Sequence, residues 1–148
     1  MKLVIQVCSK AYVETDGNRV GQIGKGAVIF VGIGKDDDTK TVDKMTDKLI
    51  KMRIYPDLKG KTNLALKDIG GSLLIISQFT LYANCRHGNR PSFVEAKEPI
   101  EANKLYEYFI DRCKRNDIHV EHGIFGADMQ VGLVNEGPFT IVLDSEEL

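Results

Sequence analysis

The sequence has few of the residues from which disulfide-stabilised, metal-binding or membrane proteins are built. Its 148 residues include only three cysteines, and no two of them form a C-x-x-C pair. An odd number with this spacing argues against a disulfide framework and against a structural zinc site. No apolar run approaches the roughly 20 residues that cross a bilayer, and the N-terminus has no signal-peptide cleavage pattern. We therefore expect a cytoplasmic protein with no membrane partner.

The sequence also lacks an excess of charge of either sign. Twenty basic and 21 acidic residues leave a formal net charge of −1. This balance argues against a protein that coats nucleic acid through a broad basic field, but it leaves room for a local contact with a phosphate or a strand end. Because there is no repeat, low-complexity segment or linker, residues 1–148 are expected to form a single domain.

Common catalytic and metal-binding motifs are missing as well. Gly32-Ile33-Gly34-Lys35 is followed by Asp36 and not by Ser or Thr, so it is not a phosphate-binding loop. His119 and His122 lie three apart on an expected strand and would point to opposite faces, which argues against joint metal ligation. No G-x-S-x-G nucleophile elbow is present. We expect neither a metal nor a cofactor.

Hydrophobic periodicity predicts mostly strands together with two amphipathic helices. Apolar residues spaced three and four apart predict helices over residues 39–52 and 99–116. Alternating or continuous apolar stretches predict strands over residues 3–13, 19–23, 26–33, 53–55, 72–83, 118–122, 128–135 and 139–144. The expected fold class is mixed α/β (α+β), with curved mixed β-sheets in a layered or barrel-like core and both helices packed on one side.

Two stretches stand out from this pattern. Ser77-Gln78-Phe79-Thr80 follows the apolar run 73–76, so its polar side chains need partners or a cavity unless the strand simply emerges into solvent. Gly137-Pro138 enters the last expected strand, where proline removes a ladder hydrogen bond and glycine leaves bare backbone. That entry is either an ordinary strand-start turn or, with a cis peptide bond, a rigid pair of carbonyl acceptors.

These stretches and their surroundings resemble a known family. The segments that resemble D-aminoacyl-tRNA deacylase (the D-tyrosyl-tRNA deacylase family), in this order, are "GKTNLAL" (60–66), "SQFTLYA" (77–83), "RPSF" (90–93) and "GIFGADMQVGLVNEGPFT" (123–140). The likeness runs from the opening "VIQ" to "TIVLD" and so covers nearly the whole chain. Residues 77–80 and Asn135-x-Gly137-Pro138-x-Thr140 correspond to the two signature motifs of the family.

The resemblance implies a homodimeric proofreading enzyme that cleaves the ester between a D-amino acid and the 3′-terminal adenosine of a tRNA. Gly137-Pro138 of one subunit would enter the pocket of the other, with Asn135 and Thr140 as further substrate-binding residues. The rigid carbonyls would leave room for a D side chain and clash with an L side chain. Because glycine has no side chain that can clash, glycyl-tRNA is also expected to be hydrolysed.

The catalytic residues implied by the resemblance are Ser77, Gln78, Phe79 and Thr80. Ester hydrolysis needs donors for a developing oxyanion, and we assign the backbone N–H groups near Phe79 and Thr80 to it. Thr80 has a hydroxyl but no histidine or carboxylate base within the motif. We therefore favour activation by the ribose 2′-OH of the tRNA, with Thr80 and Gln78 positioning the substrate; attack by Thr80 itself is the alternative.

Other residues near these motifs are candidates for binding the tRNA end. Phe125 and Met129 are placed to line an adenine pocket, and an ordinary core position is an equal alternative for both. Arg86, Arg90 and Lys97 surround the "RPSF" segment and are placed to meet the terminal phosphates.

Two residues depart from the family pattern, and two other functions stay open. Val7 stands where the family usually has an arginine that helps to hold the Gly-Pro loop, so another group must hold it here or the loop is looser. Phe139 replaces a smaller aliphatic residue and is expected to point into the core or the dimer interface. The alternatives are a non-catalytic module that binds adenosine or an RNA end, and a relative with a trans Gly-Pro peptide that acts on L-aminoacyl-tRNA.

Overall fold

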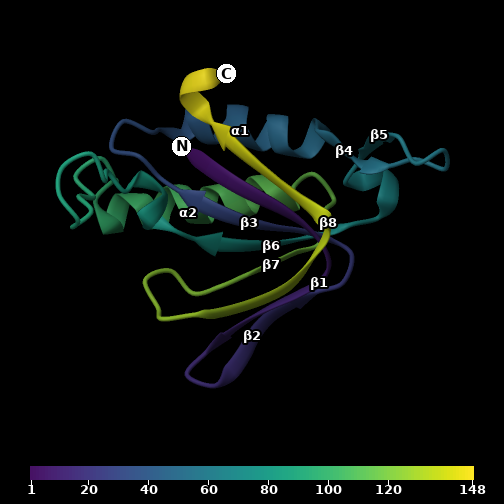
Figure 1. Ribbon diagram of the computed structural model, residues 1–148, viewed down its shortest axis with the longest axis horizontal. Helices are drawn as coiled ribbons and strands as arrows, with labels where there is room; N and C mark the ends of the chain where they lie inside the picture. The colour runs from purple at the N-terminus through teal and green to yellow at the C-terminus, as the bar shows by residue number, and fades with distance from the viewer.

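The computed structural model describes residues 1–148 and consists of a curved mixed sheet with two helices packed against it (Figure 1). The strands of this sheet are β1 (Lys2–Thr15), β2 (Asn18–Ile23), β3 (Gly26–Gly32), β6 (Ser72–Ser77), β7 (Val120–His122) and β8 (Gln130–Asp144). Their order is β2-β1-β3-β6-β7, and β8 pairs with β1. β1 runs antiparallel to β2, β3 and β8, whereas β3, β6 and β7 are parallel. The predicted mixed sheet is confirmed.

Both helices lie on the same side of the sheet, as the sequence predicts (Figure 1). α1 (Thr39–Lys51) begins at Asp38, whose carboxylate accepts a hydrogen bond of 2.9 Å from the backbone N–H of Thr41. α2 (Pro99–Lys114) has its proline in the first turn, where no N–H is needed. Tyr108 of α2 donates a hydrogen bond of 2.9 Å to Asp43 of α1, so the two helices also contact each other.

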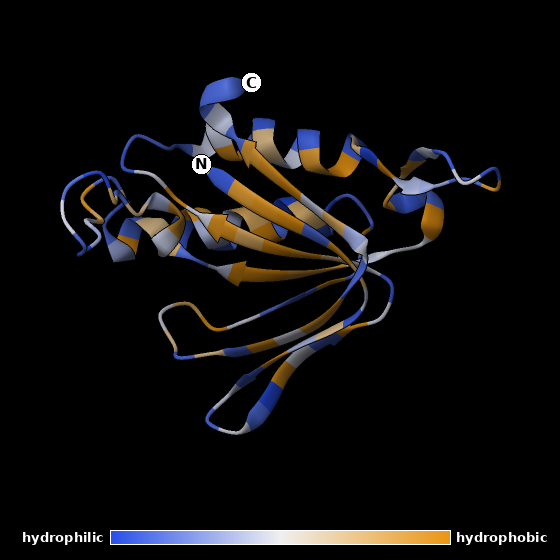
Figure 2. Ribbon diagram, in the orientation of Figure 1, coloured by the Kyte–Doolittle hydropathy of each residue, from blue (hydrophilic) through white to orange (hydrophobic).

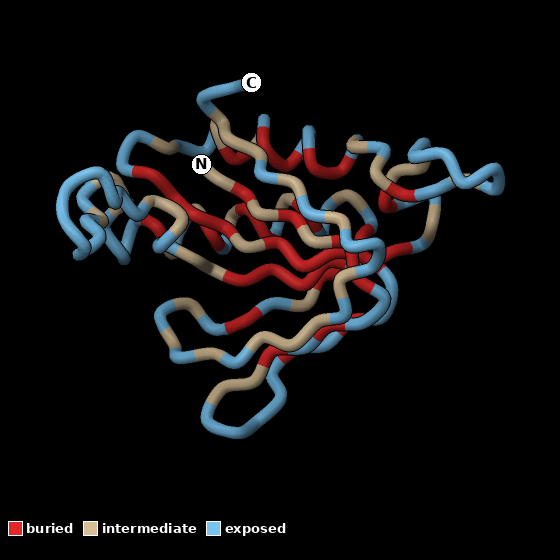
Figure 3. The backbone as a smooth tube through the Cα atoms, in the orientation of Figure 1, coloured by how far each residue is buried: buried red, intermediate tan, exposed pale blue.

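The alternation of side chains along the strands builds a hydrophobic core on each face of the sheet (Figures 2 and 3). In β6, Leu73 and Ile75 point toward the helices and join a cluster of 23 buried residues. Leu74 and Ile76 point to the other face and join a second cluster of seven buried residues. Because β1, β2 and β8 curl over that second face, the sheet is barrel-like and the strands between the cores read as continuous apolar runs.

A separate two-stranded ribbon follows α1. β4 (Arg53–Pro56) and β5 (Thr62–Ala65) pair antiparallel and project from one end of the molecule (Figure 1). Short 3-10 helices complete the chain: η1 (Lys67–Ile69), η2 (Phe79–Tyr82) and η3 (Ser145–Glu147). No helix has the length and apolar character needed to cross a membrane.

Three strand predictions were wrong in detail. The strand predicted over 72–83 ends at Ser77, and the chain turns into η2, because β3 ends at Gly32 and offers no further backbone partner. The strands predicted over 128–135 and 139–144 are one strand, β8, whose register with β1 shifts near its middle. β5 was not predicted; it is four residues long and contains two polar residues, so its apolar pattern is weak.

Candidate functional site

A pocket of about 630 Å³ opens at the end of the sheet where β3 and β6 finish. Its walls come from the ends of β3 and β6, the first turns of α2 and the segment that precedes β8. Among the residues selected from the sequence, those that line it are Ser77, Gln78, Phe79, Lys97, Phe125 and Met129. Segments far apart in the sequence therefore meet at one hollow, and most of the wall is apolar or aromatic.

The polar motif after β6 forms a turn at the rim of this pocket. The backbone N–H of Gln78 continues the ladder by donating to the carbonyl of Val31 at 2.8 Å, and the N–H of Leu81 then turns back to the carbonyl of Gln78 at 3.3 Å. The side chain of Gln78 donates a hydrogen bond of 2.5 Å to the hydroxyl of Thr80. The backbone N–H groups of Phe79 and Thr80 have no hydrogen-bond partner within the chain. Since both residues are exposed, two donors stand free beside the pocket.

The turn packs closely on Gly32, the last residue of β3, and on Gly34, two residues further along the chain. A Cβ atom at Gly32 would lie 2.9 Å from the Cβ of Leu81 and 3.2 Å from the carbonyl oxygen of Gln78. A Cβ atom at Gly34 would lie 2.5 Å from the hydroxyl oxygen of Tyr82. Only bare backbone lets η2 pack this closely. The sequence pattern excludes a phosphate-binding loop at residues 32–35, but this packing role of the glycines was not predicted. The sequence feature that indicates such a role is a pair of glycines two residues apart at the end of a buried strand.

Asp37 connects the same turn to the start of the chain. Its carboxylate accepts hydrogen bonds from the backbone N–H of Gly34 at 2.6 Å and from the hydroxyl of Tyr82 at 3.4 Å. It also forms an ion pair of 2.6 Å with the N-terminal ammonium of Met1. Burial and the neighbouring Asp37 carboxylate raise the pKa of Tyr82 above its ordinary value, so this hydroxyl stays protonated and donates.

The Gly137-Pro138 stretch lies in the middle of β8, and its peptide bond is cis. Asn135 bridges the stretch with both ends of its amide: the side-chain oxygen accepts from the N–H of Phe139 at 3.0 Å, and the nitrogen donates to the hydroxyl of Thr140 at 3.0 Å. Gly137 has a φ of +123°, a backbone conformation that side chains disfavour. Glycine, proline and Thr140 are exposed, so the bare backbone faces solvent.

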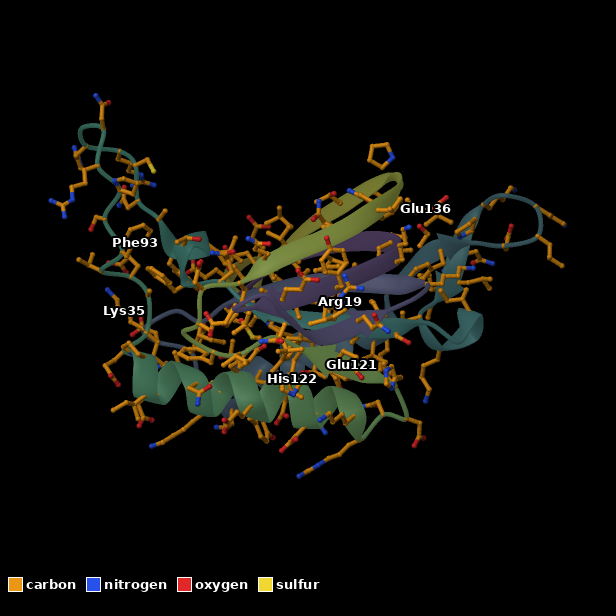
Figure 4. The ribbon with its side chains drawn as sticks, turned by 90° about the horizontal axis from the view of Figure 1, so that it is seen from below. Arg19, Lys35, Phe93, Glu121, His122 and Glu136 are labelled. Atoms are coloured by element: carbon orange, nitrogen blue, oxygen red, sulfur yellow. The ribbon has the colours of Figure 1, made fainter.

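The two motifs lie at opposite ends of the molecule in a single chain. Phe93, which lines the pocket, and Glu136, which precedes Gly137, are labelled at the two ends in Figure 4. None of residues 135–140 lines the pocket. The structure therefore brings Ser77, Gln78 and Phe79 together with Phe125 and Met129 in the pocket, whereas Thr80 lies outside the pocket lining. It separately joins Asn135 with Thr140, and it does not bring these two groups together within one protomer.

No histidine or carboxylate forms a hydrogen bond with the hydroxyl of Thr80, which lies outside the pocket lining. The lining holds no histidine and no cysteine, and its two carboxylates come from Glu98 and Asp128. Glu98 caps α2 by accepting from the backbone N–H groups of Ile100 and Glu101. Histidines lie elsewhere: His119 pairs with Glu121 at 3.2 Å, and no group of residues in the chain is arranged to hold a metal ion.

Comparison with known proteins decides the family. The sequence model of the family described as D-Tyr-tRNA(Tyr) deacylase matches residues 4–144. The chain belongs to this deacylase family. A protein named D-aminoacyl-tRNA deacylase from Lactobacillus helveticus is 54% identical over 144 residues, which are 97% of this chain and 99% of that protein. One of the same name from Thermosipho africanus is 49% identical over 148 residues, which are 100% of this chain and 99% of that protein.

Solved structures agree with the deacylase fold. A structure named c-Myc DNA Unwinding Element Binding Protein has a TM-score of 0.92 and 32% identity, and covers 97% of this chain and 98% of that chain. A second, described as a probable eukaryotic D-amino acid tRNA deacylase, has a TM-score of 0.85 and 15% identity, and covers 96% of this chain and 97% of that chain. At that identity the second likeness supports the fold alone.

Both departures from the deacylase pattern have a structural account. Val7 is buried in the main core, at the point of β1 where the pairing with β8 shifts register. The side chain of the preceding residue, Gln6, donates to the hydroxyl of Thr140 at 3.3 Å and so joins the Asn135 bridge in holding the Gly-Pro stretch. Phe139 packs against the main core, which confirms one of its two predicted places.

Proposed function

We propose that this deacylase hydrolyses the ester that joins a D-amino acid to the 3′-terminal adenosine of a tRNA, releasing the free amino acid and the tRNA. The observation that carries the proposal is the pair of unpartnered backbone N–H groups at Phe79 and Thr80. Fixed donors without internal partners suit a developing oxyanion, because they need no rearrangement when charge appears on the ester oxygen.

The pocket supplies a surface for the terminal adenosine. Phe125 packs on Tyr106 with ring centroids 5.8 Å apart, and Phe79 meets Phe93 edge to face at 5.0 Å. Phe125 also contacts the main core, so it serves both as core and as pocket wall. Aromatic and thioether groups stack well on a base, which supports Phe125 and Met129 as the adenine-binding pair. Lys97 lines the pocket beside them, while Arg86 and Arg90 are exposed in the preceding loop.

Activation of the attacking group is assigned to the tRNA. The hydroxyl of Thr80 accepts a hydrogen bond from Gln78, and no histidine or carboxylate hydrogen-bonds to it as a base would. The 2′-OH of the terminal ribose is adjacent to the ester in the substrate itself. In this scheme Gln78 and Thr80 orient the ester, Ser77 ends the strand that carries the turn, and the ribose hydroxyl assists the attack by water.

Chiral selection is assigned to the bare backbone at Gly137 and Pro138 of a second protomer. Within one chain this stretch is at the end opposite the pocket, so it can contact the substrate only in a dimer. β8 supports such an assembly, because it is a 15-residue strand paired on one side only, with Val134 45% and Val142 67% exposed. Rigid carbonyls near the α-carbon would admit a D side chain and clash with an L side chain.

The experiment compares D-tyrosyl-tRNA, L-tyrosyl-tRNA and glycyl-tRNA by the amino acid that each releases. We expect hydrolysis of the D and glycyl esters and protection of the L ester. Equal rates for the two tyrosyl esters would refute the clash model, and preference for the L ester would indicate the relative that acts on L substrates. Protection of the tRNA end without release would indicate a non-catalytic binder.

The assembly needs its own measurement. Sedimentation equilibrium is expected to give twice the mass of the chain, 16.5 kDa per protomer. A monomer that still discriminates between the two tyrosyl esters would rule out selection by a partner's backbone. Since tRNAs are charged in the cytoplasm, we place the reaction there.

A further inference from the structure

Charge is unevenly distributed along this nearly neutral chain. Residues 39–68, which we call the basic arm, comprise α1, the β4–β5 ribbon and most of η1. This arm contains eight of the 20 lysines and arginines but only four of the 21 acidic residues. The rest of the chain is therefore acidic. Four cations of the arm lie on α1, and the other four lie on the ribbon that follows it and on η1. All eight cationic residues of the arm are exposed.

The acidic residues of the arm are occupied by other contacts. Asp43 forms an ion pair with Arg112 of α2 at 2.7 Å, and Asp47 pairs with Lys51 at 3.5 Å. Asp57 accepts from two backbone N–H groups and so closes the turn of the ribbon. Asp68 accepts from the backbone N–H of Ala65 at 2.8 Å. Of the four carboxylates, only Asp47 pairs with a cation of the arm, Lys51. The other three contact Arg112 or backbone N–H groups.

Most of the cations of the arm, in contrast, have no partner. Lys51 pairs with Asp47, and Lys44 contacts the carbonyl oxygen of Leu148. The others form no ion pair: Lys40, Lys48, Arg53, Lys59, Lys61 and Lys67. A group of unpaired, exposed cations attracts a polyanion such as a nucleic acid. Contacts of this kind go to the phosphates and do not read the sequence.

The β4–β5 ribbon of the arm lies at the end of the molecule that the proposed dimer brings to the partner's pocket (Figure 1). The β4–β5 ribbon projects from one end of the molecule (Figure 1). In Figure 4, Glu136, which precedes Gly137, lies toward that end, and Phe93 of the pocket lies toward the other. If Gly137-Pro138 of one protomer enters the pocket of the other, the ribbon of that first protomer flanks the pocket mouth. Its lysines then face the nucleic acid that extends from the bound 3′ end.

We propose that the basic arm binds the sugar-phosphate backbone of the tRNA stem next to the 3′ end, with Lys48, Lys59 and Lys61 as its principal contacts. The proposal rests on the proposed function. Contacts of this kind carry no sequence information, so the arm would accept many tRNAs while the pocket reads only the terminal aminoacyl-adenosine. A net charge of −1 on the whole chain is compatible with this role, because only the basic arm meets the polyanion.

The test compares two substrates that share the ester and differ in phosphates. D-tyrosyl-tRNA carries the complete stem, and D-tyrosyl-adenosine carries none. The variant combines Lys48→Gln, Lys59→Gln and Lys61→Gln. The control combines Lys25→Gln, Lys114→Gln and Arg115→Gln, which also removes three exposed cations that form no ion pair.

We expect the arm variant to fall about tenfold or more in kcat/KM toward D-tyrosyl-tRNA, through KM, while its rate on D-tyrosyl-adenosine equals that of the wild type. The salt dependence of kcat/KM should also become shallower, by about 0.7–0.9 in the log–log slope for each phosphate that the variant no longer neutralises. The control variant should match the wild type on both substrates and in its salt dependence.

Three results would overturn the proposal: an arm variant that behaves as the wild type on tRNA, an equal decrease in the arm and control variants, or an equal decrease on both substrates. Wild-type protein that leaves D-tyrosyl-adenosine and D-tyrosyl-tRNA intact would instead refute the proposed function. A thermal midpoint equal to that of the wild type confirms that the arm variant is folded.

Discussion

Replacing Gly32 with alanine tests whether the turn at residues 79–82 is the catalytic element. Gly32 has no positive φ, so alanine is compatible with its backbone conformation. The added methyl group would lie 2.9 Å from the Cβ of Leu81 and 3.2 Å from the carbonyl oxygen of Gln78. Neither atom is the end of a flexible side chain. Relief of the contact therefore requires the backbone of the turn to move, together with the two free N–H groups.

The size of the effect follows from these distances. Two carbon atoms pack best at about 3.5–4.0 Å, so the turn has to retreat by about 0.6 Å or more. Misplacement on the order of 1 Å costs about 10²-fold in rate, and we expect kcat to fall about 10- to 100-fold. Overpacking of this kind also costs about 1–3 kcal/mol of stability. For a chain of this size that corresponds to a thermal midpoint lowered by roughly 3–10 °C.

The assay is release of tyrosine from D-tyrosyl-tRNA, with kcat and KM determined separately and thermal unfolding measured in parallel. Gly24→Ala is the matched control, because a Cβ atom at Gly24 has nothing within 4 Å and its φ is not positive. It should equal the wild type in rate and stability. If Gly32→Ala lowers the thermal midpoint but leaves kcat unchanged, the chemistry does not take place at this turn.

Further predictions concern the other motif residues and the cysteines. Thr80→Ala should lower kcat and leave residual turnover, whereas complete loss with tRNA binding intact would make Thr80 the nucleophile. Asn135→Ala removes two hydrogen bonds of 3.0 Å across the Gly-Pro stretch and should raise hydrolysis of L-tyrosyl-tRNA relative to the D ester by about 3- to 10-fold, since each bond contributes about 0.5–1.5 kcal/mol. Burial raises the pKa of the Cys113 thiol from 9.0 to about 12, and that of Cys8 to about 11. As the pH rises, these thiols ionise at a lower pH in the unfolded chain than in the folded one. Their contribution to the free energy of unfolding should therefore be constant below pH 9 and fall by about 1.4 kcal/mol per pH unit per thiol above it. Urea titrations at pH 8 and 10.5 would measure this decrease. Iodoacetamide should modify only Cys85 in the native protein and all three cysteines in denaturant.

The helices were predictable because their signals are local. Asp38 and Pro99 are residues that start helices, and the apolar spacing identifies the buried faces without any knowledge of the sheet. The strand over 78–83 was predicted wrongly because an extended segment needs a partner. Residues 77–83 have strand-like composition, but β3 ends at Gly32 and the segment has no ladder to join. Composition identifies a candidate strand; the neighbouring strand's length decides where it stops.

The candidate site divides in the same way. The polar turn and the Gly-Pro stretch were visible in the sequence because each breaks a local rule: polar residues after a buried run, and proline within a strand. The glycines below the turn were missed, since their role depends on Leu81 and Tyr82, which approach them only after β3 and β6 pair. The unpaired charge of the basic arm was hidden for a similar reason. Net charge counts Asp43 against the lysines of the arm, whereas in the fold its carboxylate pairs with Arg112 of α2.

The two parts of the proposed site lie at opposite ends of the chain, so the proposed dimer would link dimerisation to substrate binding. The free N–H donors of Phe79 and Thr80 lie on the turn at the rim of the pocket, while the Gly137-Pro138 stretch and the ribbon of the basic arm lie toward the opposite end. If both proposals hold, dimer formation brings two parts of each protomer to the pocket of the other: the Gly137-Pro138 stretch, which selects the D ester, and the basic arm, which binds the tRNA. Dilution of the protein below its dimer dissociation constant should then abolish D-over-L preference and the advantage of tRNA over D-tyrosyl-adenosine at the same concentration. If one end of a protomer supplies both properties, dissociation of the dimer removes both at once. Loss of the D-over-L preference and of the tRNA advantage at different concentrations would therefore show that the arm does not act at the partner's pocket.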